Sequence, residues 1–212
     1  MNTRAPIDLN PRILDFCGSI SPELPEVLKC EPSDFAMASE CFSNVELQVE
    51  RHGGRAILGW LIWDWEGVYT EAEFHAVWES ADGRRHEISP HASSDPYVVF
   101  LQDAASEYKG LRVNNIRRAA NENKVIADLI RLCGADFNRF GQLRDGVELV
   151  GREAKLYQSA QAARRMLVST LESGANRNAR CLCGSGERYK RCHEDWVHRV
   201  IDGLASDIKV SL

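Results

Sequence analysis

Three cysteines and one histidine lie close together near the end of the chain, in the order Cys181, Cys183, Cys192 and His193. Thiolates and imidazoles are soft donors, and four of them suit a zinc ion in tetrahedral coordination. Because protein fills all four positions, no place is left for a substrate, so we expect a structural metal. The turn Gly184-Ser185-Gly186 lets the backbone fold back towards the thiolates. A disulfide or reactive thiols are the alternative, but the adjacent Cys-His pair and the glycine-rich loop favour a metal.

The run from Asn178 to His193 resembles the SEC-C motif, the small zinc knuckle of the SecA preprotein-translocase ATPase that also occurs on many other bacterial proteins. The resemblance includes Asn178, the Gly-Ser-Gly turn and Tyr189-Lys190. Many members end in Cys-Cys, whereas this chain has Cys192-His193, which still supplies a fourth ligand. The resemblance implies a bound Zn2+ and a contact with a protein partner such as a chaperone, with the ribosome, or with an anionic surface. Fe2+ competes for thiolate-rich sites, so iron is the alternative metal.

The segment around these ligands is more basic than the rest of the chain. The formal net charge of the whole chain is -5, which argues against a general nucleic-acid coat. Between Arg177 and Arg199, six cations stand against three acids: Arg177, Arg180, Arg188, Lys190, Arg191 and Arg199 against Glu187, Glu194 and Asp195. Three thiolates and one zinc ion subtract only about one further charge. We therefore expect the knuckle to carry a local basic patch.

A second candidate site lies in the first half of the chain, on residues 71–78. The alternation of a strand places Glu71, Glu73 and His75 on one face, opposite a face that carries Ala72, Phe74, Ala76 and Trp78. Two carboxylates and an imidazole could perform acid/base chemistry or bind a metal weakly if that face lines a cleft. If the face is buried, each of them needs a partner.

Cys41 lies near the expected start of a helix, where the helix dipole favours a thiolate. The chain order Cys41, His75, Glu87 resembles that of the transglutaminase-like and papain-like cysteine enzymes, in which Cys, His and Asp or Asn follow one another. In this interpretation Cys41 attacks an acyl carbon, His75 takes and returns the proton, and Glu87 orients the ring. The alternative is that Cys41 is a small buried hydrophobic residue and His75 a structural one.

Much of the same region resembles a domain that precedes SEC-C knuckles in other bacterial proteins and names no activity. The matching stretches are Glu40-Cys41-Phe42, His52-Gly53-Gly54, Gly59-Trp60, Ile62-Trp63 and residues 71–78. Relatives of this kind have Asp at the position of Glu87, in a segment that ends Thr-Pro rather than Ser89-Pro90. The longer carboxylate of Glu87 can still hold a histidine.

The other polar candidates show no spacing typical of a site. We expect four histidines to lie on the surface: His52, His86, His91 and His198. The run Asn114-Asn115-Ile116-Arg117-Arg118 could contact phosphate or RNA, but a solvated helix face is the interpretation that we favour. Four cysteines outside the knuckle have no framework spacing and are expected to be free thiols: Cys17, Cys30, Cys41 and Cys133.

The pattern of apolar residues and breakers predicts an α+β fold in four parts. Residues 1–33 contain five prolines and are expected to be an N-terminal arm. Residues 34–103 form the α+β core domain, with a helix that carries Cys41 and ends at Gly53, and a small antiparallel meander of strands near 55–65, 68–78, 85–89 and 97–101. Residues 104–175 are expected to be helical, with helices that begin near Val113, Val125 and Leu156. Residues 176–212 hold the knuckle and a terminal helix.

Composition places the chain among ordinary globular proteins. Hydrophobic residues make up 44% and charged residues 27%, and no apolar run approaches the roughly 20 residues that cross a bilayer. The first 15 residues lack the basic flank and apolar core of a secretory signal, so we expect the protein in the cytoplasm.

Two functions fit these observations. The first is a zinc-binding interaction or targeting module, whose basic knuckle contacts a protein partner, the ribosome or another nucleic-acid assembly, or an anionic surface. The second is a cysteine-type hydrolase or acyl transferase that acts on a peptide or another amide-containing substrate, with a site made of Cys41, His75 and Glu87. In the second case the knuckle would deliver the enzyme to its partner.

Overall fold

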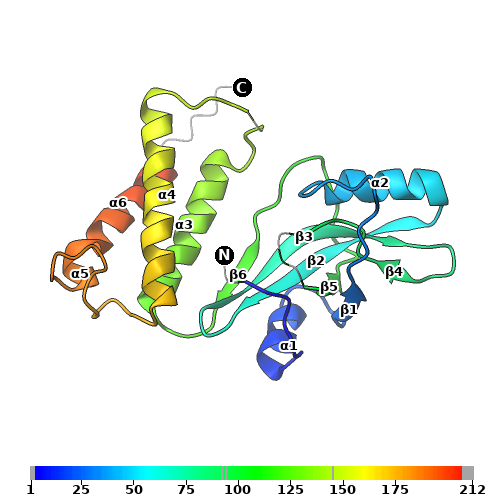
Figure 1. The fold of residues 1–212 in the computed structure, drawn as a ribbon, viewed down its shortest axis with the longest axis horizontal. Coiled ribbons are helices and arrows are strands. Elements are labelled where there is room, and N and C mark those ends of the chain that lie inside the picture. The colour runs from blue at the N-terminus through cyan, green and yellow to red at the C-terminus, as the bar shows by residue number, and fades with distance from the viewer. Residues whose placement is uncertain (1–2, 92, 94, 145, 207–212) are drawn as a thin grey trace. The chain divides into compact units, whose positions relative to one another are not determined.

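A computed structural model describes residues 3–91, 93, 95–144 and 146–206. The chain divides into two compact units, Met1–Arg118 and Ala119–Leu212, which we call unit 1 and unit 2 (Figure 1). The mixture of helices with an antiparallel sheet confirms the predicted α+β class. Among the described residues, no helix combines the length and the apolar character that a membrane span requires.

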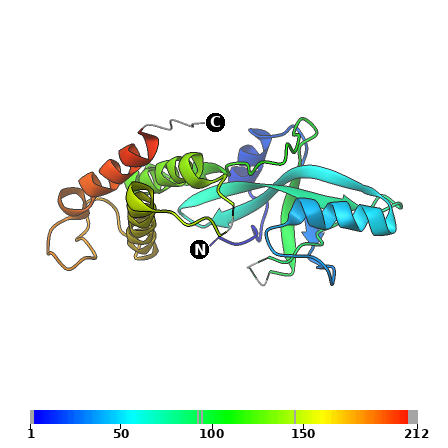
Figure 2. The same ribbon diagram turned by 90° about the horizontal axis from the view of Figure 1, so that it is seen from above.

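A long hairpin forms the centre of unit 1. β2 (Arg55–Trp65) and β3 (Tyr69–Glu79) pair along their whole lengths, from Arg55 opposite Glu79 to Trp65 opposite Tyr69. Gly67, with a φ of 74°, makes the turn between them where the sequence predicts one. Figure 2 shows the two strands, in cyan, twisting about each other. The register places His75 opposite Gly59, so no side chain stands across from the imidazole on that strand.

The rest of the sheet departs from the predicted meander. The strand order is β1-β5-β2-β3-β4, with β6 also paired to β3. The added strands are β1 (Glu26–Lys29), β4 (Arg85–His86), β5 (Tyr97–Gln102) and β6 (Ile116–Ala119). β5 does not continue beyond β4 but returns to the far side of β2, because that edge offers a free hydrogen-bonding ladder to a segment whose residues Val98 to Leu101 are buried.

The two ends of this sheet approach each other, so that one face is enclosed. Cys30, directly after β1, forms a parallel bridge with Glu87, directly after β4. The amide of Glu31 donates to the carbonyl of Glu87 (2.8 Å), and that of Ser33 to the carbonyl of Ile88 (3.1 Å). The enclosed face packs a cluster of apolar side chains: Leu28, Ile57, Leu61, Trp63, Val77, Val98 and Phe100. Residues 1–33 therefore do more than an arm would, because they supply a strand of the sheet.

Two helices pack against the opposite face of the hairpin. α1 (Pro11–Gly18) begins after Asn10, whose side chain accepts from the amides of Arg12 and Ile13. α2 (Cys41–His52) begins at Cys41 and is followed by Gly53, which has a φ of 71°. Val45 of α2 packs against Ala76 and Ile88. The start of α2 is thereby fixed against β3 and the segment that follows β4.

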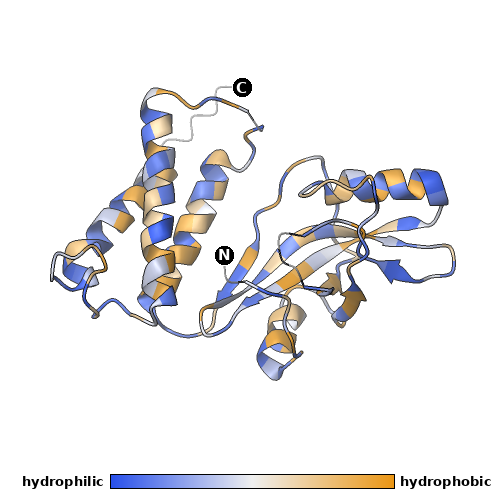
Figure 3. Ribbon diagram, viewed as in Figure 1, coloured by the Kyte–Doolittle hydropathy of each residue, from blue (hydrophilic) through white to orange (hydrophobic). Residues whose placement is uncertain are grey.

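Unit 2 is a bundle of three helices with the knuckle inserted before the last one. The helices are α3 (Lys124–Phe140), α4 (Gly151–Glu172) and α6 (Glu194–Ala205), which contact one another pairwise, and the short α5 (Tyr189–Cys192) lies in the knuckle. Figure 3 shows hydrophobic and hydrophilic turns alternating along α4, and its buried residues, such as Ala160, Ala163 and Leu167, recur at helical spacing. The terminal helix falls where the sequence predicts it.

The helix predicted to begin near Val113 is wrong. Ile116–Ala119 is the strand β6, paired with β3. The edge of β3 that β2 leaves open offers hydrogen bonds that a four-residue segment with no apolar periodicity cannot obtain by itself. Tertiary pairing therefore decides its conformation over local preference.

Candidate functional site

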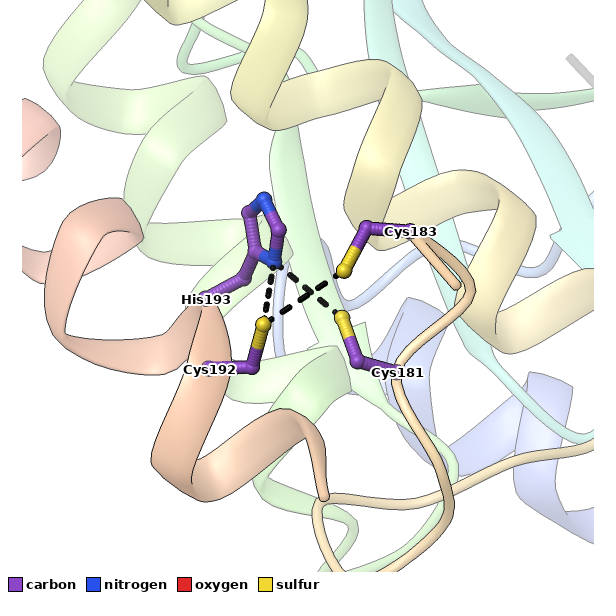
Figure 4. Close-up of side chains that lie close together, drawn as sticks. All are labelled: Cys181, Cys183, Cys192 and His193. Carbon is purple, nitrogen blue, oxygen red and sulfur yellow. Dashed lines mark hydrogen bonds between the residues drawn. The ribbon is translucent and has the colours of Figure 1, made fainter. Parts of the chain in front are cut away.

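The four donor atoms predicted to bind a metal in unit 2 converge on one point (Figure 4). His193 Nδ1 lies 3.1 Å from Cys181 Sγ and 3.2 Å from Cys192 Sγ, and Cys183 Sγ lies 3.5 Å from Cys192 Sγ. Metal–ligand bonds of about 2.0 to 2.3 Å in a tetrahedron separate neighbouring ligand atoms by roughly 3.3 to 3.8 Å. The distances therefore fit a single bound ion, while 3.5 Å between sulfurs is far longer than a disulfide of about 2.05 Å.

The loop between the ligands is folded by its glycines and by backbone pairing. Gly184 and Gly186 have φ values of 80° and 78°, which other residues rarely adopt. The amide of Cys181 donates to the carbonyl of Glu187 (2.7 Å), and the amide of Tyr189 to that of Ala179 (2.9 Å). These bonds hold the two arms of the loop together, so that the first two sulfurs face the pair on and after α5.

Residues 177–195 match the model of the SEC-C motif. The chain carries a SEC-C motif. No curated protein matches the chain, and no solved structure does. The metal-binding set and the matched residues coincide, because Cys181, Cys183, Cys192 and His193 all lie inside the match.

Polar contacts to buried carboxylates join the SEC-C knuckle to α6 and α6 to the rest of the bundle. Arg177, at its start, donates from Nε to Glu194 Oε1 (2.7 Å) and from a second guanidinium nitrogen to Oε2, which ties it to the beginning of α6. His198 of α6 lies 3.0 Å from Asp128 of α3. Tyr189 is buried. The side chain of His198 is 39% exposed and so lies at the surface, but it also bonds to the buried carboxylate of Asp128, which its sequence position did not indicate.

The two first sulfurs of the SEC-C knuckle have different proton affinities. Burial raises the pKa of the Cys181 thiol to about 11. Hydrogen bonds from the Ser185 side chain and backbone lower the pKa of the exposed Cys183 thiol to about 6. A metal ion must therefore displace a proton from Cys181 when it binds, whereas Cys183 is largely a thiolate at neutral pH.

In unit 1 the structure brings together the three residues of the predicted cysteine site. His75 Nε2 lies 2.7 Å from Glu87 Oε2, and the two side chains are 6% and 0% exposed. Cys41, the first residue of α2, is the second partner of the imidazole. Strand alternation places His75 and Glu87 on the enclosed face, because His86 pairs with Trp78 and the next residue faces the other way.

Burial and the electrostatic contacts of this pair shift the two pKa values in opposite directions. The contacts outweigh burial, so both groups are ionised. Burial alone lowers the pKa of His75, but the charge of Glu87, contact with Cys41 and the hydrogen bond to Glu87 outweigh it, so that the pKa is raised. Burial alone raises the pKa of Glu87, but the charge and hydrogen bond of His75, together with the nearby His91, lower it. The two shifts agree on a buried imidazolium beside a carboxylate.

A chain of hydrogen bonds that the sequence did not reveal connects the carboxylate of Glu87 to the start of α2. The amide of Ser89 donates to Glu87 Oε1 (2.7 Å), and the buried side chain of Asn44 donates to Ser89 Oγ (3.1 Å). The same amide group of Asn44 exchanges bonds with the backbone of Met37, at 2.9 and 2.8 Å. Asn44 lies three residues after Cys41, on the same side of the helix, and that spacing is the signal that could have identified it.

His91 is a further member of the cluster that the sequence placed on the surface, and that prediction is wrong. Its side chain is 12% exposed, and its Nε2 lies 3.5 Å from Glu87 Oε1. Its ring centroid is 5.8 Å from that of His75 and 5.7 Å from that of Trp63. The position four residues after Glu87 gave no signal on its own, because no helix or strand connects the two.

The two acidic neighbours of His75 on β3 take separate partners. Glu71 pairs with Arg117 of β6, and both side chains are largely buried. Arg117 therefore does not lie on a solvated helix face, which corrects the prediction for residues 114–118. Glu73 accepts a hydrogen bond from the indole of Trp63 (2.7 Å) and is itself exposed. The face that holds His75 thus opens to solvent only two residues away.

The SEC-C knuckle is expected to depend on its metal for folding. Replacing both Cys183 and Cys192 by Ser should leave the protein with one metal ion fewer than the wild type and lower the stability of unit 2 by about 3 kcal/mol or more, because metal binding is coupled to folding. Metal content by mass spectrometry and thermal unfolding by circular dichroism measure both effects. Replacement of Cys30 by Ala, outside the knuckle, is the control, and equal metal content in all three proteins would contradict the assignment.

The buried pair predicts a specific dependence of stability on pH. Because the pKa of Glu87 is lowered from 4.5, its contribution is present above pH 4.5 and is lost as the pH falls below it. Because the pKa of His75 is raised from 6.5, its contribution is present below pH 6.5 and is lost as the pH rises. Replacing Glu87 by Gln should therefore destabilise unit 1 most between pH 4.5 and 6.5, by about 3 kcal/mol, since one partner of a buried pair is left behind.

Tryptophan fluorescence during denaturant unfolding measures this difference in unit 1, because four of the five tryptophans lie there. Replacement of the exposed Glu31, paired with Lys29, by Gln is the matched control and should change little. A destabilisation that is the same at every pH would show that the pair is not ionised.

Proposed function

We propose that unit 1 is a cysteine-dependent hydrolase or acyl transferase that acts on a peptide or another amide-containing substrate. The observation that carries this proposal is the position of Cys41, at the start of α2 and beside the imidazole of the buried His75–Glu87 pair. A thiol, a histidine and a carboxylate in that order of contact can perform nucleophilic catalysis.

The ring nitrogens of His75 divide their tasks in this proposal. Nε2 is engaged by Glu87, so Nδ1 is the nitrogen that can exchange a proton with the thiol of Cys41. The carboxylate of Glu87 fixes the plane of the ring and stabilises its protonated form. Ser89 donates to the carboxylate of Glu87, and Asn44 of α2 donates to Ser89. These two hydrogen bonds hold Glu87 at a fixed distance from the start of α2.

The reaction proceeds in two balanced steps. With the proton held on His75 as an imidazolium, the sulfur of Cys41 attacks the carbonyl carbon of the amide. As the carbon–nitrogen bond breaks, the imidazolium returns the proton to the leaving amine, and a thioester remains on Cys41. Water or an acceptor amine then attacks the thioester and gives its proton to His75, which restores the imidazolium, and the acid or the new amide is released as the carbon–sulfur bond breaks.

The start of α2 also offers donors for the negative charge that develops on the carbonyl oxygen. No side chain caps this end of the helix, since Glu40, the residue before Cys41, makes no capping bond. The first amides of a helix have no partner within it and carry the positive end of the dipole. In this proposal they stabilise the oxyanion next to the attacking sulfur.

The cysteine chemistry can be tested with p-nitrophenyl acetate, an activated acyl ester. We expect a burst of nitrophenol and an acetyl group that peptide mapping places on Cys41, at a rate at least tenfold above that of Cys17, whose pKa burial raises to about 11. Replacing Cys41 by Ala should abolish the burst, whereas replacing Cys30 by Ala should keep it. If Cys41 is acylated no faster than Cys17, the residue belongs to the core and the enzyme proposal fails.

A second function, for unit 2, is favoured by the surface of the SEC-C knuckle. The ligand set suits Zn2+, with Fe2+ as the competing ion, and it is closed, so the metal organises the fold rather than a reaction. Arg180, Arg188 and Arg191 are exposed around it. We infer that this basic surface binds an anionic partner, which is an acidic protein surface or the ribosome.

Charge reversal tests this interaction without removing the metal. Replacing Arg180, Arg188 and Arg191 by Glu should weaken co-sedimentation with purified ribosomes at least tenfold at low salt, and rising salt should weaken the wild type in the same direction, because exposed charges are screened. Arg84→Glu, on the surface of unit 1, is the control. If the triple variant has normal metal content and still binds ribosomes, the basic surface is not what binds the partner.

A further inference from the structure

Three side chains of unit 1 converge in a way that the cysteine chemistry does not fully use. His75 lies on β3, Glu87 directly follows β4, and His91 lies four residues further along. One nitrogen or oxygen atom of each falls within 4.8 Å of the others. Acylation by Cys41 requires His75 and Glu87 but assigns no task to His91.

The geometry around Glu87 is that of a carboxylate between two imidazoles. Its Oε2 lies 2.7 Å from His75 Nε2, and its Oε1 lies 3.5 Å from His91 Nε2. The second distance is too long for a good hydrogen bond, and His91 Nε2 is buried with no hydrogen-bond partner among the residues that the structure describes. A buried polar nitrogen of this kind costs free energy unless something binds it.

We propose that His75, Glu87 and His91 form a second metal site in this chain, which takes Zn2+. Two imidazoles and one carboxylate are a common three-ligand set for zinc, with bonds of about 2.0 to 2.2 Å. Neighbouring donors in such a site are roughly 3.3 Å apart, a value that lies between the two separations around Glu87, 2.7 and 3.5 Å. The site differs from the SEC-C knuckle in its elements and in its hard oxygen ligand, and it leaves a fourth coordination position open.

The thiol of Cys41 contacts His75 but is not among the atoms that converge on the site, so the fourth position is left to water or another ligand. Zinc at the site occupies the imidazole nitrogen that otherwise faces Glu87 and withdraws electron density from the ring, so that the other nitrogen binds the proton of Cys41 less tightly. The ion therefore blocks the sulfur as a nucleophile. This regulatory consequence rests on the proposed cysteine chemistry, whereas the binding of zinc does not.

Counting zinc tests the site directly. The full-length protein, saturated with Zn2+ and passed through a desalting column, should retain two ions per chain by mass spectrometry, and His91→Ala and His91→Gln should each retain one. His86→Ala, in which a half-buried histidine of β4 is removed, is the matched control and should retain two. Circular dichroism establishes that the variants are folded. One ion per chain in the wild type, or two in both His91 variants, overturns the proposal.

Protection of Cys41 tests the regulatory consequence. Iodoacetamide should alkylate Cys41 at least tenfold more slowly in the zinc-saturated wild type than after treatment with a chelator, and zinc should give no such protection in His91→Gln. Equal rates with two ions bound would overturn the blocking of Cys41 and leave the metal site standing. If Cys41 is as unreactive as Cys17 after chelation while two ions still bind, the cysteine enzyme fails and the zinc site does not.

Discussion

The ion pair between His75 and Glu87 is the interaction on which the arrangement of unit 1 depends. Removing two charges from water costs several kcal/mol for each ion, and their attraction offsets this only when their remaining hydrogen-bonding capacity is satisfied. The closure of the sheet provides that environment, because the segment after β1 binds the backbone of Glu87 while Ser89 binds its carboxylate. Since a well-packed apolar pair would often be as stable or more so, stability alone does not account for a buried pair of this kind.

The two ligand-rich clusters of the chain differ in completeness. In the SEC-C knuckle four donors already face one point, and no position is left for a reactant. In unit 1 three donors lie close together, and the thiol of Cys41 contacts one of them, the imidazole of His75. The first arrangement suits folding, because a loop of this size has little apolar core of its own. The second fits the proposed cysteine chemistry, because its members lie in contact and still have donor or acceptor capacity for a further partner.

Local patterns predicted the elements that are long and continuous. The hairpin of β2 and β3 follows from two apolar runs about a glycine, and α3, α4 and α6 follow from apolar residues at three- and four-residue steps. β1 and β6 have four residues each, too few for a period to be read, and both exist because a distant strand leaves an edge open. The crossing of β5 to the far side of β2 has the same cause, since no local signal states which of two free edges a strand joins.

The candidate site shows the same division between what alternation determines and what it does not. Alternation correctly assigned Glu71, Glu73 and His75 to one face of β3, but their partners come from three distant segments. Arg117 neutralises Glu71 and Trp63 binds Glu73, so the row of acids does not act as one group. Because Glu73 is exposed while His75 is buried, the boundary between solvent and the protein interior lies between these two positions. Trp63, which binds Glu73, is also in ring contact with His91, so these two rings lie beside that boundary.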